Sequence, residues 1–351
     1  MNLYLRADGS RALGLGHVAR CYALAQEARR RGMTPRFLTR RLDGKAEEKL
    51  ALLGQETILL AGPADSPADL SESLDAIRRT AGREGLAGAI LVTDHTGLDA
   101  AWIAGAREAG PVVVCLNDLP AIRYESQIVV NGNLGAKNFA YDAAPDTRLL
   151  LGPAYLLFRD AFLAAGLRRK ADPQRARRIV ISLGAGDAGN ATERVLDALS
   201  AIPDSLSLTI VAGGAYGHLA SLEQAARRSP HDVAISVDLP ETAHCFAAAE
   251  LAICAGGSTA YEMALLGVPA IVLVLSETQK DAARALDAAG VALCAGVPDP
   301  EAIAREAAAL CRDSDRRRSM RERGTALFDG LGRGRVLDAA RACLPGAGGA
   351  A

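Results

Sequence analysis

The stretch ICAGGSTAYEMALLGVPAIVLVL, residues 253–275, contains every part of one β-α-β unit. An apolar run leads into a Gly-Gly turn with two hydroxyl residues, and a helical segment then stops at Gly-Val-Pro before a second apolar run. Strands that alternate with helices in this way are typical of a parallel sheet with helices on both faces. The stretch therefore predicts an α/β fold for the half of the chain that contains it.

The same alternation runs through the whole chain of 351 residues. Short β-rich runs are separated by Ala-, Leu- and Arg-rich segments of helical spacing, among them 17–31, 66–82 and 98–109. The expected strands are 3–7, 36–38, 57–60, 89–94, 112–117 and 128–132 in the first half, and 178–184, 207–213, 233–238, 251–257, 269–275 and 291–296 in the second. We expect two doubly wound, Rossmann-like domains that face each other across a cleft, with ligands at the carboxyl ends of the strands.

A charged segment marks the expected domain boundary. GLRRKADPQRARR, residues 166–178, contains a proline and lacks apolar periodicity, as is typical of an interdomain linker. We therefore expect an N-terminal domain at 1–165 and a C-terminal domain at 179–330. The remaining residues, 331–351, are expected to form a helix followed by a Gly-rich tail.

Composition excludes several classes of partner. The 40 Lys and Arg nearly balance the 41 Asp and Glu, which gives no reason to expect nucleic acid. No apolar run approaches the roughly 20 residues that cross a bilayer, and the first residues lack an export signal, so we expect a cytoplasmic protein without membrane insertion. The seven cysteines form neither a disulfide framework nor a CxxC metal pair. No DxD-like or His/Asp cluster suggests a metal ion, and no cofactor is expected.

The Gly-Gly turn of the opening stretch predicts an anion site at the start of a helix. Gly256 and Gly257 let backbone amides point outward, and Ser258 and Thr259 add hydroxyl donors, a combination suited to a phosphate. Glu262 follows Thr259 by three residues. Two interpretations fit this spacing equally well. One is a capping box between Thr259 and Glu262; the other is a carboxylate that hydrogen-bonds both hydroxyls of a ribose.

A second glycine-rich loop, SLGAGDAGNAT at 182–192, also follows an expected strand and opens a helix. The amide of Gly184 and its neighbours are candidates to face the same ligand. Asp187 and Asn190 are interpreted as helix caps by default, and as ligand contacts only if the cleft is built as expected.

The most polar strand end is RADGSRALGLGHVARC, residues 6–21. Its GLGHVA matches the dinucleotide fingerprint GxGxxA, but the glycines do not directly follow the strand. The next strand also ends in FLTRR, without an acidic residue for a ribose, so NAD is disfavoured. The two glycines, Gly14 and Gly16, allow a close approach of the backbone to a ligand.

The histidine after these glycines, His17, is expected at the first helical position. The positive end of the helix dipole would keep its imidazole neutral and able to accept a proton. The alternative is that His17 only caps or packs at the helix start. Arg6, Asp8 and Arg20 crowd into the same strand-end region, which a plain turn would not require.

Several motifs together resemble a known family, the UDP-2,4-diacetamido-2,4,6-trideoxy-β-L-altropyranose hydrolases of pseudaminic acid biosynthesis. The motifs stand in the family's order over about residues 3 to 340 and read RADGSRALGLGHVARCYALA, VTDHTGLD, LNDLP, LLLGPAYLLFRDAF, SLGAGDAGNAT, AGGSTAYEMALLGVPAIVLVLSETQ and FDGLGRGRV. Those hydrolases look like members of the GT-B glycosyltransferase superfamily. The resemblance implies a GT-B fold with UDP on the C-terminal domain, a catalytic His17, and a Glu262 that holds the uridine ribose.

The resemblance also covers residues near the sugar. Asp94 and His95, at a strand end, are candidates to line the cleft, although a satisfied loop histidine is the safer interpretation of His95. The chain departs from the family pattern at Thr96, where the family usually has an aromatic residue, and at Thr278 in the sequence Glu277-Thr278-Gln279. Gln279 itself keeps the family residue and is a candidate for substrate binding.

The implied activity is hydrolysis of a UDP-sugar, in which water attacks the anomeric carbon with inversion and His17 acts as the base. The product would be a free 2,4-diacetamido sugar for a nonulosonic acid that decorates flagellin or surface polysaccharide. The expected partners are a small-molecule UDP-sugar and other enzymes of the sugar pathway. Two other classes stay open: a GT-B glycosyltransferase that delivers the sugar to another acceptor, and a non-catalytic nucleotide-sugar-binding protein.

Overall fold

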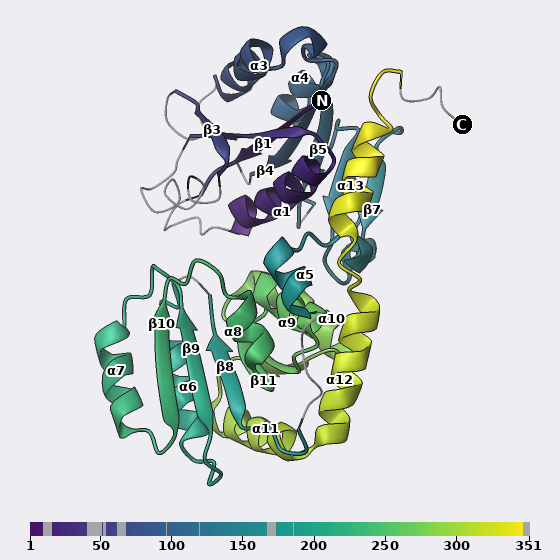
Figure 1. The fold of residues 1–351 in the computed structure, drawn as a ribbon. Helices are drawn as coiled ribbons and strands as arrows, with labels where there is room; N and C mark the ends of the chain where they lie inside the picture. Colours follow the sequence, from purple (N-terminus) through teal and green to yellow (C-terminus); the bar gives the residue numbers. More distant parts are fainter. Residues whose placement is uncertain are drawn as a thin grey trace. The chain divides into compact units, whose positions relative to one another are not determined.

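The computed structural model describes residues 1–9, 16–40, 51, 54–61, 68–95, 97–118, 120–166, 173–184 and 186–346. The chain divides into two units, coloured along the sequence in Figure 1. Unit 1 consists of Met1–Arg159 and Gly330–Ala351, and unit 2 consists of Asp160–Asp329.

Unit 1 is built on a parallel sheet of seven strands in the order β3-β2-β1-β4-β5-β6-β7. The strands are β1 (Asn2–Ala7), β2 (Thr34–Thr39), β3 (Glu56–Leu59), β4 (Ala89–Asp94), β5 (Val112–Leu116), β6 (Ile128–Asn131) and β7 (Arg148–Leu151). The helices with described bounds are α1 (Gly16–Arg30), α3 (Asp69–Thr80), α4 (Ala100–Glu108) and α13 (Gly332–Arg341), with short 3-10 turns η1 (Gly82–Glu84), η2 (Ala136–Asn138) and η3 (Pro153–Tyr155).

The two faces of this sheet carry separate apolar cores, because successive side chains of a strand point to opposite faces. Leu3 and Leu5 of β1 pack with α1 and α13 on one face, and these two helices lie side by side in Figure 1. Tyr4 belongs to the other core, with Ile77 of α3 and Trp102 of α4. Helices on both faces confirm the doubly wound arrangement that the alternating pattern predicts.

Unit 2 repeats the plan with six parallel strands in the order β10-β9-β8-β11-β12-β13. The strands are β8 (Arg178–Ser182), β9 (Ser207–Ala212), β10 (Asp232–Val237), β11 (Leu251–Ala255), β12 (Ala270–Leu273) and β13 (Leu293–Gly296). The helices are α5 (Asp160–Gly166), α6 (Ala191–Leu199), α7 (Leu219–Arg228), α8 (Ala243–Ala248), α9 (Ser258–Leu266), α10 (Lys280–Ala288), α11 (Pro300–Arg312) and α12 (Ser314–Leu327), with the 3-10 turn η4 (Glu277–Gln279).

Unit 2 begins at Asp160, before the end of the N-terminal domain expected at residue 165, whereas its end at Asp329 is within one residue of the end expected at 330. Helix α5 belongs to unit 2 because it packs on α8 and α9. At the other crossing, α13 returns to unit 1, where Gly332 lies so close to the backbone that an added Cβ would be 2.2 Å from the carbonyl oxygen of Leu156. The C-terminal helix is therefore part of unit 1. Residues 167–172 of the expected linker lie outside the described residues.

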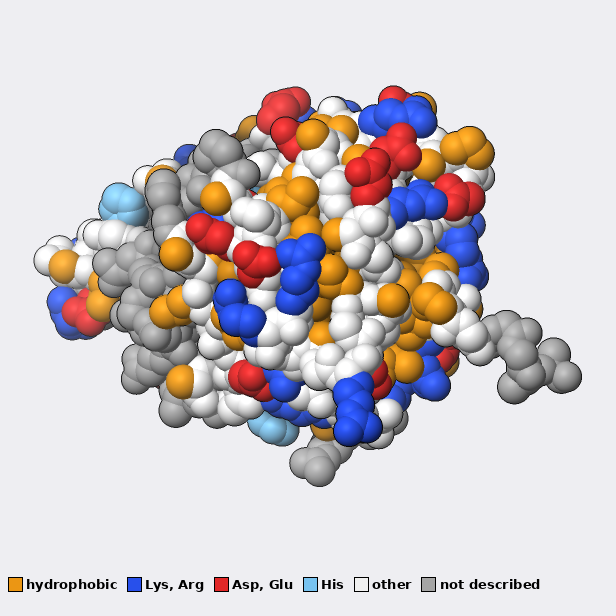
Figure 2. Space-filling model, turned by 90° about the horizontal axis from the view of Figure 1, so that it is seen from above, with side chains coloured by type: hydrophobic (Ala, Val, Ile, Leu, Met, Phe, Trp, Pro, Cys, Tyr) orange, Lys and Arg blue, Asp and Glu red, His pale blue; other side chains and the backbone are white. Residues whose placement is uncertain are grey.

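The charges on the surface follow the balanced composition. On the face drawn in Figure 2, basic and acidic side chains lie interspersed rather than in one patch of a single sign. Within the described ranges, none of the helices combines the length and the apolarity that crossing a membrane requires.

Candidate active site

Each sheet has one point where the strand order reverses, and the predicted site residues lie beside these points. In unit 1 the reversal is between β1 and β4, so the start of α1 lies next to the end of β4. In unit 2 it is between β8 and β11, so the loops after these two strands are neighbours. Open α/β sheets bind ligands at such switch points, at the carboxyl ends of the strands.

At the unit 1 switch point, His17 of α1 is paired with Asp94 at the end of β4. Nδ1 of His17 lies 2.6 Å from Oδ1 of Asp94. The carboxylate is buried, with 1% of the Asp94 side chain exposed, whereas 26% of the His17 side chain is exposed. Because a carboxylate accepts, Nδ1 carries the hydrogen of this bond and Nε2 is the nitrogen left to accept a proton. Among the described residues, none hydrogen-bonds to Nε2.

Arg20, one helical turn after His17, joins this pair to a second carboxylate. Its Nε and Nη2 donate to both oxygens of Asp94, at 2.9 and 2.8 Å. Its Nη1 donates to both oxygens of Asp118, which follows β5, at 2.6 and 2.7 Å. Asp118 also accepts a bond of 2.8 Å from Nδ2 of Asn133, beyond β6. The start of α1 and the ends of three neighbouring strands thus contribute to one polar cluster.

The helix dipole, which was expected to set the proton affinity of His17, is not its main determinant. The hydrogen bond from His17 to Asp94 raises the pKa of the imidazole above its ordinary value, and this outweighs the opposing effect of burial. A further reason is geometric, since α1 begins at Gly16 and His17 is its second residue rather than its first. The dipole of an exposed helix end contributes typically about 0.3–1 kcal/mol, less than a hydrogen bond to a buried charge.

Arg6 and Asp8, two of the residues expected to contact substrate, are instead 1% exposed and bound to each other. Nη1 and Nη2 of Arg6 donate to the two oxygens of Asp8 at 2.6 and 3.0 Å. Nε and Nη2 also donate to Asp69 of α3, at 3.1 and 2.7 Å. Buried charges require such partners, so these residues support the site from beneath rather than line it.

Both ring nitrogens of His95 have hydrogen-bond partners, so the structure favours a structural loop histidine over one that lines the cleft. Its Nε2 lies 2.9 Å from Oδ2 of Asp8, and its Nδ1 accepts a bond of 2.9 Å from the backbone N–H of Gly97. An accepting Nδ1 places the hydrogen on Nε2, which donates to Asp8. His95 therefore holds the loop after β4 against the loop after β1. Thr96, between these two contacts, and Gly14 lie outside the described residues.

Three site residues were missed from the sequence: Arg40, Asp69 and Asp118. Arg40 donates through Nε to Asp69 at 2.5 Å, and its backbone N–H donates to Asp8 at 2.8 Å. Trp102 Nε1 adds a bond of 3.0 Å to Asp69. A signal was present, because an arginine inside a buried strand such as Arg6 demands counter-charges. Asp118 lies in the LNDLP motif, which by itself does not indicate a role for the aspartate.

At the unit 2 switch point, α9 begins as the Gly-Gly turn predicts. Gly257 is the N-cap residue, in an extended conformation and without a side-chain cap. The N–H groups of Gly256 and Gly257 donate to the carbonyls of Leu273 and Ala255 at 3.0 and 2.8 Å, so these two amides do not point outward. The amides left to a ligand are those of Ser258 and Thr259, in the first turn. The capping-box interpretation is wrong, because Thr259 lies inside the helix rather than at its cap. Glu262 is half-buried on the next turn.

Two glycines of this turn have different surroundings. A Cβ on Gly256 would be 3.1 Å from the carbonyl oxygen of Gln279, whereas a Cβ on Gly257 would meet nothing within 4 Å. The Gln279 side chain turns back to the main chain, where its Oε1 accepts a bond of 2.9 Å from the N–H of Leu275. Gln279 therefore fixes the loop after β12, and its Nε2 is the atom left for a ligand.

The loop after β8 is closed by its own side chains. Gly184 has φ of 98°, in a region that favours glycine. The carboxylate of Asp187 accepts from the N–H groups of Ala191 and Thr192, at 2.8 and 2.7 Å, which confirms Asp187 as a cap of α6. Asn190 donates its side-chain amide to Glu193 at 2.6 Å instead. The start of α6 already holds an anion, whereas in the described part of the chain no side chain caps the start of α9.

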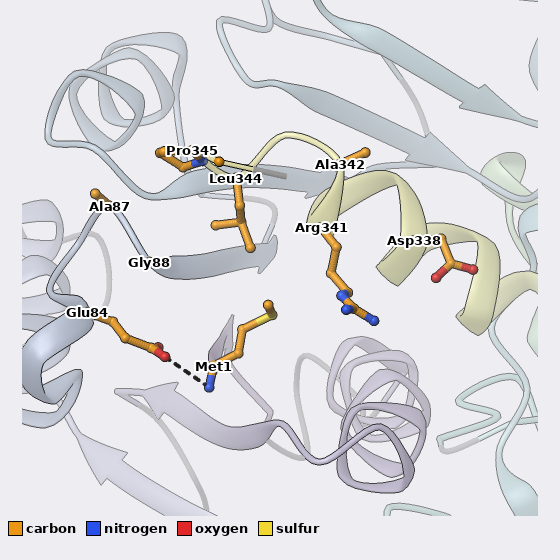
Figure 3. A pocket seen from close by; sticks show the side chains of 10 residues that line it. Met1, Glu84, Ala87, Gly88, Asp338, Arg341, Ala342, Leu344 and Pro345 are labelled. Atoms are coloured by element: carbon orange, nitrogen blue, oxygen red, sulfur yellow. Dashed lines mark ion pairs between the residues drawn. The ribbon is translucent and has the colours of Figure 1, made fainter. Parts of the chain in front are cut away.

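A hollow of about 910 Å³ lies elsewhere in unit 1 (Figure 3). Its lining comes from the first residue before β1, the turn before β4 and the end of α13: Met1, Glu84, Ala87, Gly88, Asp338, Arg341, Ala342, Leu344, Pro345 and Gly346. Met1 and Gly88 precede their strands, so this hollow is at the amino edge of the sheet, opposite to the His17 cluster. In the described part of the chain, no group of three or more His, Cys, Asp or Glu is placed to hold a metal ion.

Comparison with known proteins shows the fold. No family model matches the chain. Two curated proteins are similar in sequence: the spore coat polysaccharide biosynthesis protein SpsG of Bacillus subtilis, 30% identical over 60% of this chain, and an uncharacterized Methanocaldococcus jannaschii protein, 24% identical over 80% of it. The chain spans less than two thirds of these relatives' own lengths, 63% and 57% respectively.

Solved structures match over nearly the whole chain. MurG of Acinetobacter baumannii has a TM-score of 0.65 at 16% identity and covers 97% of this chain and 98% of its own. A glycosyltransferase from Rickettsia africae has a TM-score of 0.66 at 12% identity, covering 98% and 99%. A putative UDP-N-acetylglucosamine 2-epimerase from Listeria monocytogenes has a TM-score of 0.62 at 13% identity, covering 97% and 96%. With its two Rossmann-like units, the chain has the GT-B-like fold of these structures.

Proposed function

We propose that the protein is an enzyme that acts on a UDP-sugar. The observation that carries this proposal is the His17–Asp94 pair, a partly exposed imidazole whose Nδ1 is fixed by a buried carboxylate and whose Nε2 is left for substrate. This is the arrangement of a general base and its orienting group. The names of the similar proteins, a polysaccharide biosynthesis protein and a UDP-sugar epimerase among them, support the substrate class.

The nucleotide half of the ligand is assigned to unit 2. The uncapped amides at the start of α9 and the hydroxyls of Ser258 and Thr259 would hold the diphosphate. Glu262, further along the same helix, would hold the ribose hydroxyls. The start of α6 is a poor second binding site for phosphate, because the first amides of this helix already donate to the carboxylate of Asp187. Gly184 and Gln279 would shape the loops after β8 and β12 that border this ligand site.

The reaction we propose is hydrolysis at the anomeric carbon. His17 Nε2 takes a proton from water while the water oxygen forms a bond to that carbon from the face opposite the diphosphate. The bond from carbon to the diphosphate oxygen breaks, its electron pair leaves with UDP, and the configuration is inverted. Amide and hydroxyl donors at α9 stabilise the departing negative charge. The motif resemblance supports UDP-2,4-diacetamido-2,4,6-trideoxy-β-L-altropyranose as the substrate and nonulosonic acid synthesis as the setting.

The imidazolium formed in this step is well placed to be stabilised. It would face Asp94, whose negative charge is buried, and the neighbouring Asp118. A base of this type contributes about 10²–10⁴-fold to the rate. The role of Asp94 is to hold the ring and its tautomer, as in other carboxylate–histidine pairs.

The test is turnover of this UDP-sugar by the purified protein in oxygen-18-labelled water. Label in the free sugar supports attack at carbon, and label in UDP overturns the proposed step. His17→Gln should lose about 10²-fold or more of turnover while it keeps its affinity for UDP. His95→Gln is the matched control, because His95 bonds to Asp8 and is assigned no proton transfer. Equal activity of His17→Gln and the parent would remove His17 from the reaction.

A glycosyltransferase is the second candidate, favoured by the similarity of the fold to MurG and to the Rickettsia glycosyltransferase. The same His17 would then deprotonate a hydroxyl of an acceptor instead of water. Release of UDP only after an acceptor alcohol is added would support this activity. Binding of UDP-sugar without any turnover, with or without acceptors, would leave a binding protein.

A further inference from the structure

We propose that Asp118, acting through Arg20, is a positioning residue that sets the charge balance around His17. The inference rests on the proposed function for its meaning in catalysis, since it assumes that His17 exchanges a proton. Asp118 does not touch His17 by any hydrogen bond among the described residues. It acts by holding the guanidinium that lies against Asp94.

The guanidinium of Arg20 is held between two carboxylates. The guanidinium uses one edge, Nε and Nη2, for Asp94, and uses Nη1 for Asp118. A planar fork held at two edges has little freedom to rotate. Nη2 also lies 3.3 Å from Nδ1 of His17, so Arg20 contacts the imidazole as well as its carboxylate. Any change in the position of Arg20 therefore reaches His17 directly.

Asp118 is in turn fixed by the end of β6. Its side chain accepts a hydrogen bond of 2.8 Å from Nδ2 of Asn133, and its backbone carbonyl accepts one of 2.9 Å from Nδ2 of Asn131. Asn131 is 1% exposed, so this anchor is buried. The buried end of β6 therefore holds Asp118, whose side chain is 46% exposed, and Asp118 in turn holds Arg20.

The side chains around His17 carry a net negative formal charge. Arg20 carries one positive charge, and Asp94 and Asp118 carry one negative charge each, so these three side chains sum to −1. The set becomes neutral when His17 takes a proton. Both carboxylates attract that proton, and Arg20 repels it, which agrees with the raised pKa of His17. Without Asp118, Arg20 would offset the charge of Asp94, and a charged imidazole would keep only its hydrogen bond to that carboxylate.

One further titratable group lies next to this cluster. Cys21, which follows Arg20 in α1, is a buried thiol whose pKa is raised by burial, and it stays neutral. Asp94 comes from β4, Asp118 from the end of β5, and Arg20 from α1 itself. Residues 10–15, which precede the helix, lie outside the described residues. The described charges that act on His17 are therefore the three of the cluster.

The experiment is titration of the histidine ring signals by NMR in carbon-13-labelled protein, which needs neither substrate nor activity. His17 is assigned by the signal that His17→Gln removes. We expect the titration midpoint of His17 to fall by on the order of one pH unit or less in Asp118→Asn, and to rise in Arg20→Gln. The double variant should show a smaller effect of Asp118→Asn than the parent background does, because the link through Arg20 is gone.

The matched control is Asp142→Asn, which removes an exposed carboxylate paired with Arg123 at 2.7 Å in the same unit. It should leave the His17 midpoint unchanged, and the signals of the other histidines report whether each variant is folded. An unmoved midpoint in Asp118→Asn overturns the inference whether or not the protein is a hydrolase. A raised KM in Asp118→Asn, with the titration midpoint of His17 unchanged, would indicate that Asp118 contacts the substrate instead. Failure of the proposed function would appear separately, as no turnover by a parent protein whose His17 titrates as expected.

Discussion

Nδ1 of His17 lies 2.6 Å from the buried carboxylate of Asp94, a residue 77 positions away in the chain. The pairing exists because β4 lies beside β1 in the sheet, which brings the end of β4 next to the start of α1. The strand order therefore brings together the pair that fixes the tautomer of His17, and Nε2 is the nitrogen left to accept a proton.

The Asp94→Asn substitution should cost more activity than affinity. The new amide side chain could offer either an oxygen or an N–H group to His17, so the hydrogen would no longer be confined to Nδ1. We expect kcat to fall by about 10²–10⁴-fold, with binding of UDP nearly unchanged. Steady-state kinetics together with calorimetric titration of UDP measure the two quantities. A fall in UDP affinity as large as the fall in kcat would argue against an orienting role.

The rate should depend on pH through His17. Because its pKa is raised above the ordinary value of 6.5, the neutral base is lost at a higher pH than for an exposed histidine as the solution is acidified. We expect kcat/KM to rise with pH, with a midpoint above 6.5 that moves down in Asp94→Asn. A midpoint at or below the ordinary value in the parent protein would contradict the geometry.

The buried cluster of Arg6, Asp8 and Asp69 should be essential for folding. Arg6→Met leaves two buried carboxylates without their shared cation, and removal of one partner from such a set typically costs about 3–5 kcal/mol. Arg78→Met is the control, because Arg78 forms an exposed pair with Asp75 on α3 and should change the free energy of unfolding little. Urea denaturation measures both. Similar effects of the two substitutions would mean that burial does not govern the cluster.

The glycine turn before α9 offers a test of the diphosphate site. Gly257→Ala places a Cβ where nothing lies within 4 Å, so the fold should be unaffected. If the diphosphate packs on this turn, the methyl group should weaken UDP binding by on the order of tenfold or more, as a loss of one or two amide contacts implies. Unchanged affinity for UDP in a stable Gly257→Ala protein would place the diphosphate elsewhere.

Turnover should not require a divalent metal, since the amides and hydroxyls at α9 are assigned the charge of the leaving UDP. Activity should persist after treatment with EDTA. Loss of turnover in EDTA that magnesium restores would contradict this assignment and would move part of the charge stabilisation from the protein to a metal ion.

The strands could be predicted well because each is a short apolar run between helical segments. β7, Arg148–Leu151, was missed because it is a brief run at the edge of the sheet with two exposed residues, Arg148 and Leu149. The position of His17 at a helix start was also predictable from the glycines before it. Its charge was not, because the deciding partner, Asp94, is distant in sequence.

The buried network shows the same limit. Arg6 and Asp8 were singled out as polar groups at a strand end, but their burial depends on Asp69, which is 63 residues from Arg6. Local sequence indicates residue type and spacing, and it does not reveal which long-range partner consumes a charged group. Asp187 could be predicted as a cap because its partners, Ala191 and Thr192, are close along the chain.

The cap made by Asp187 has a consequence for ligand competition in unit 2. The Asp187 carboxylate is covalently held beside the amides of Ala191 and Thr192, so it competes with free anions for these amides. Its effective concentration there is about millimolar or higher. Free phosphate and other small anions of the solution are thereby turned away from α6. The chain thus supplies its own anion to the start of α6, and under the proposed function the diphosphate would bind at the start of α9.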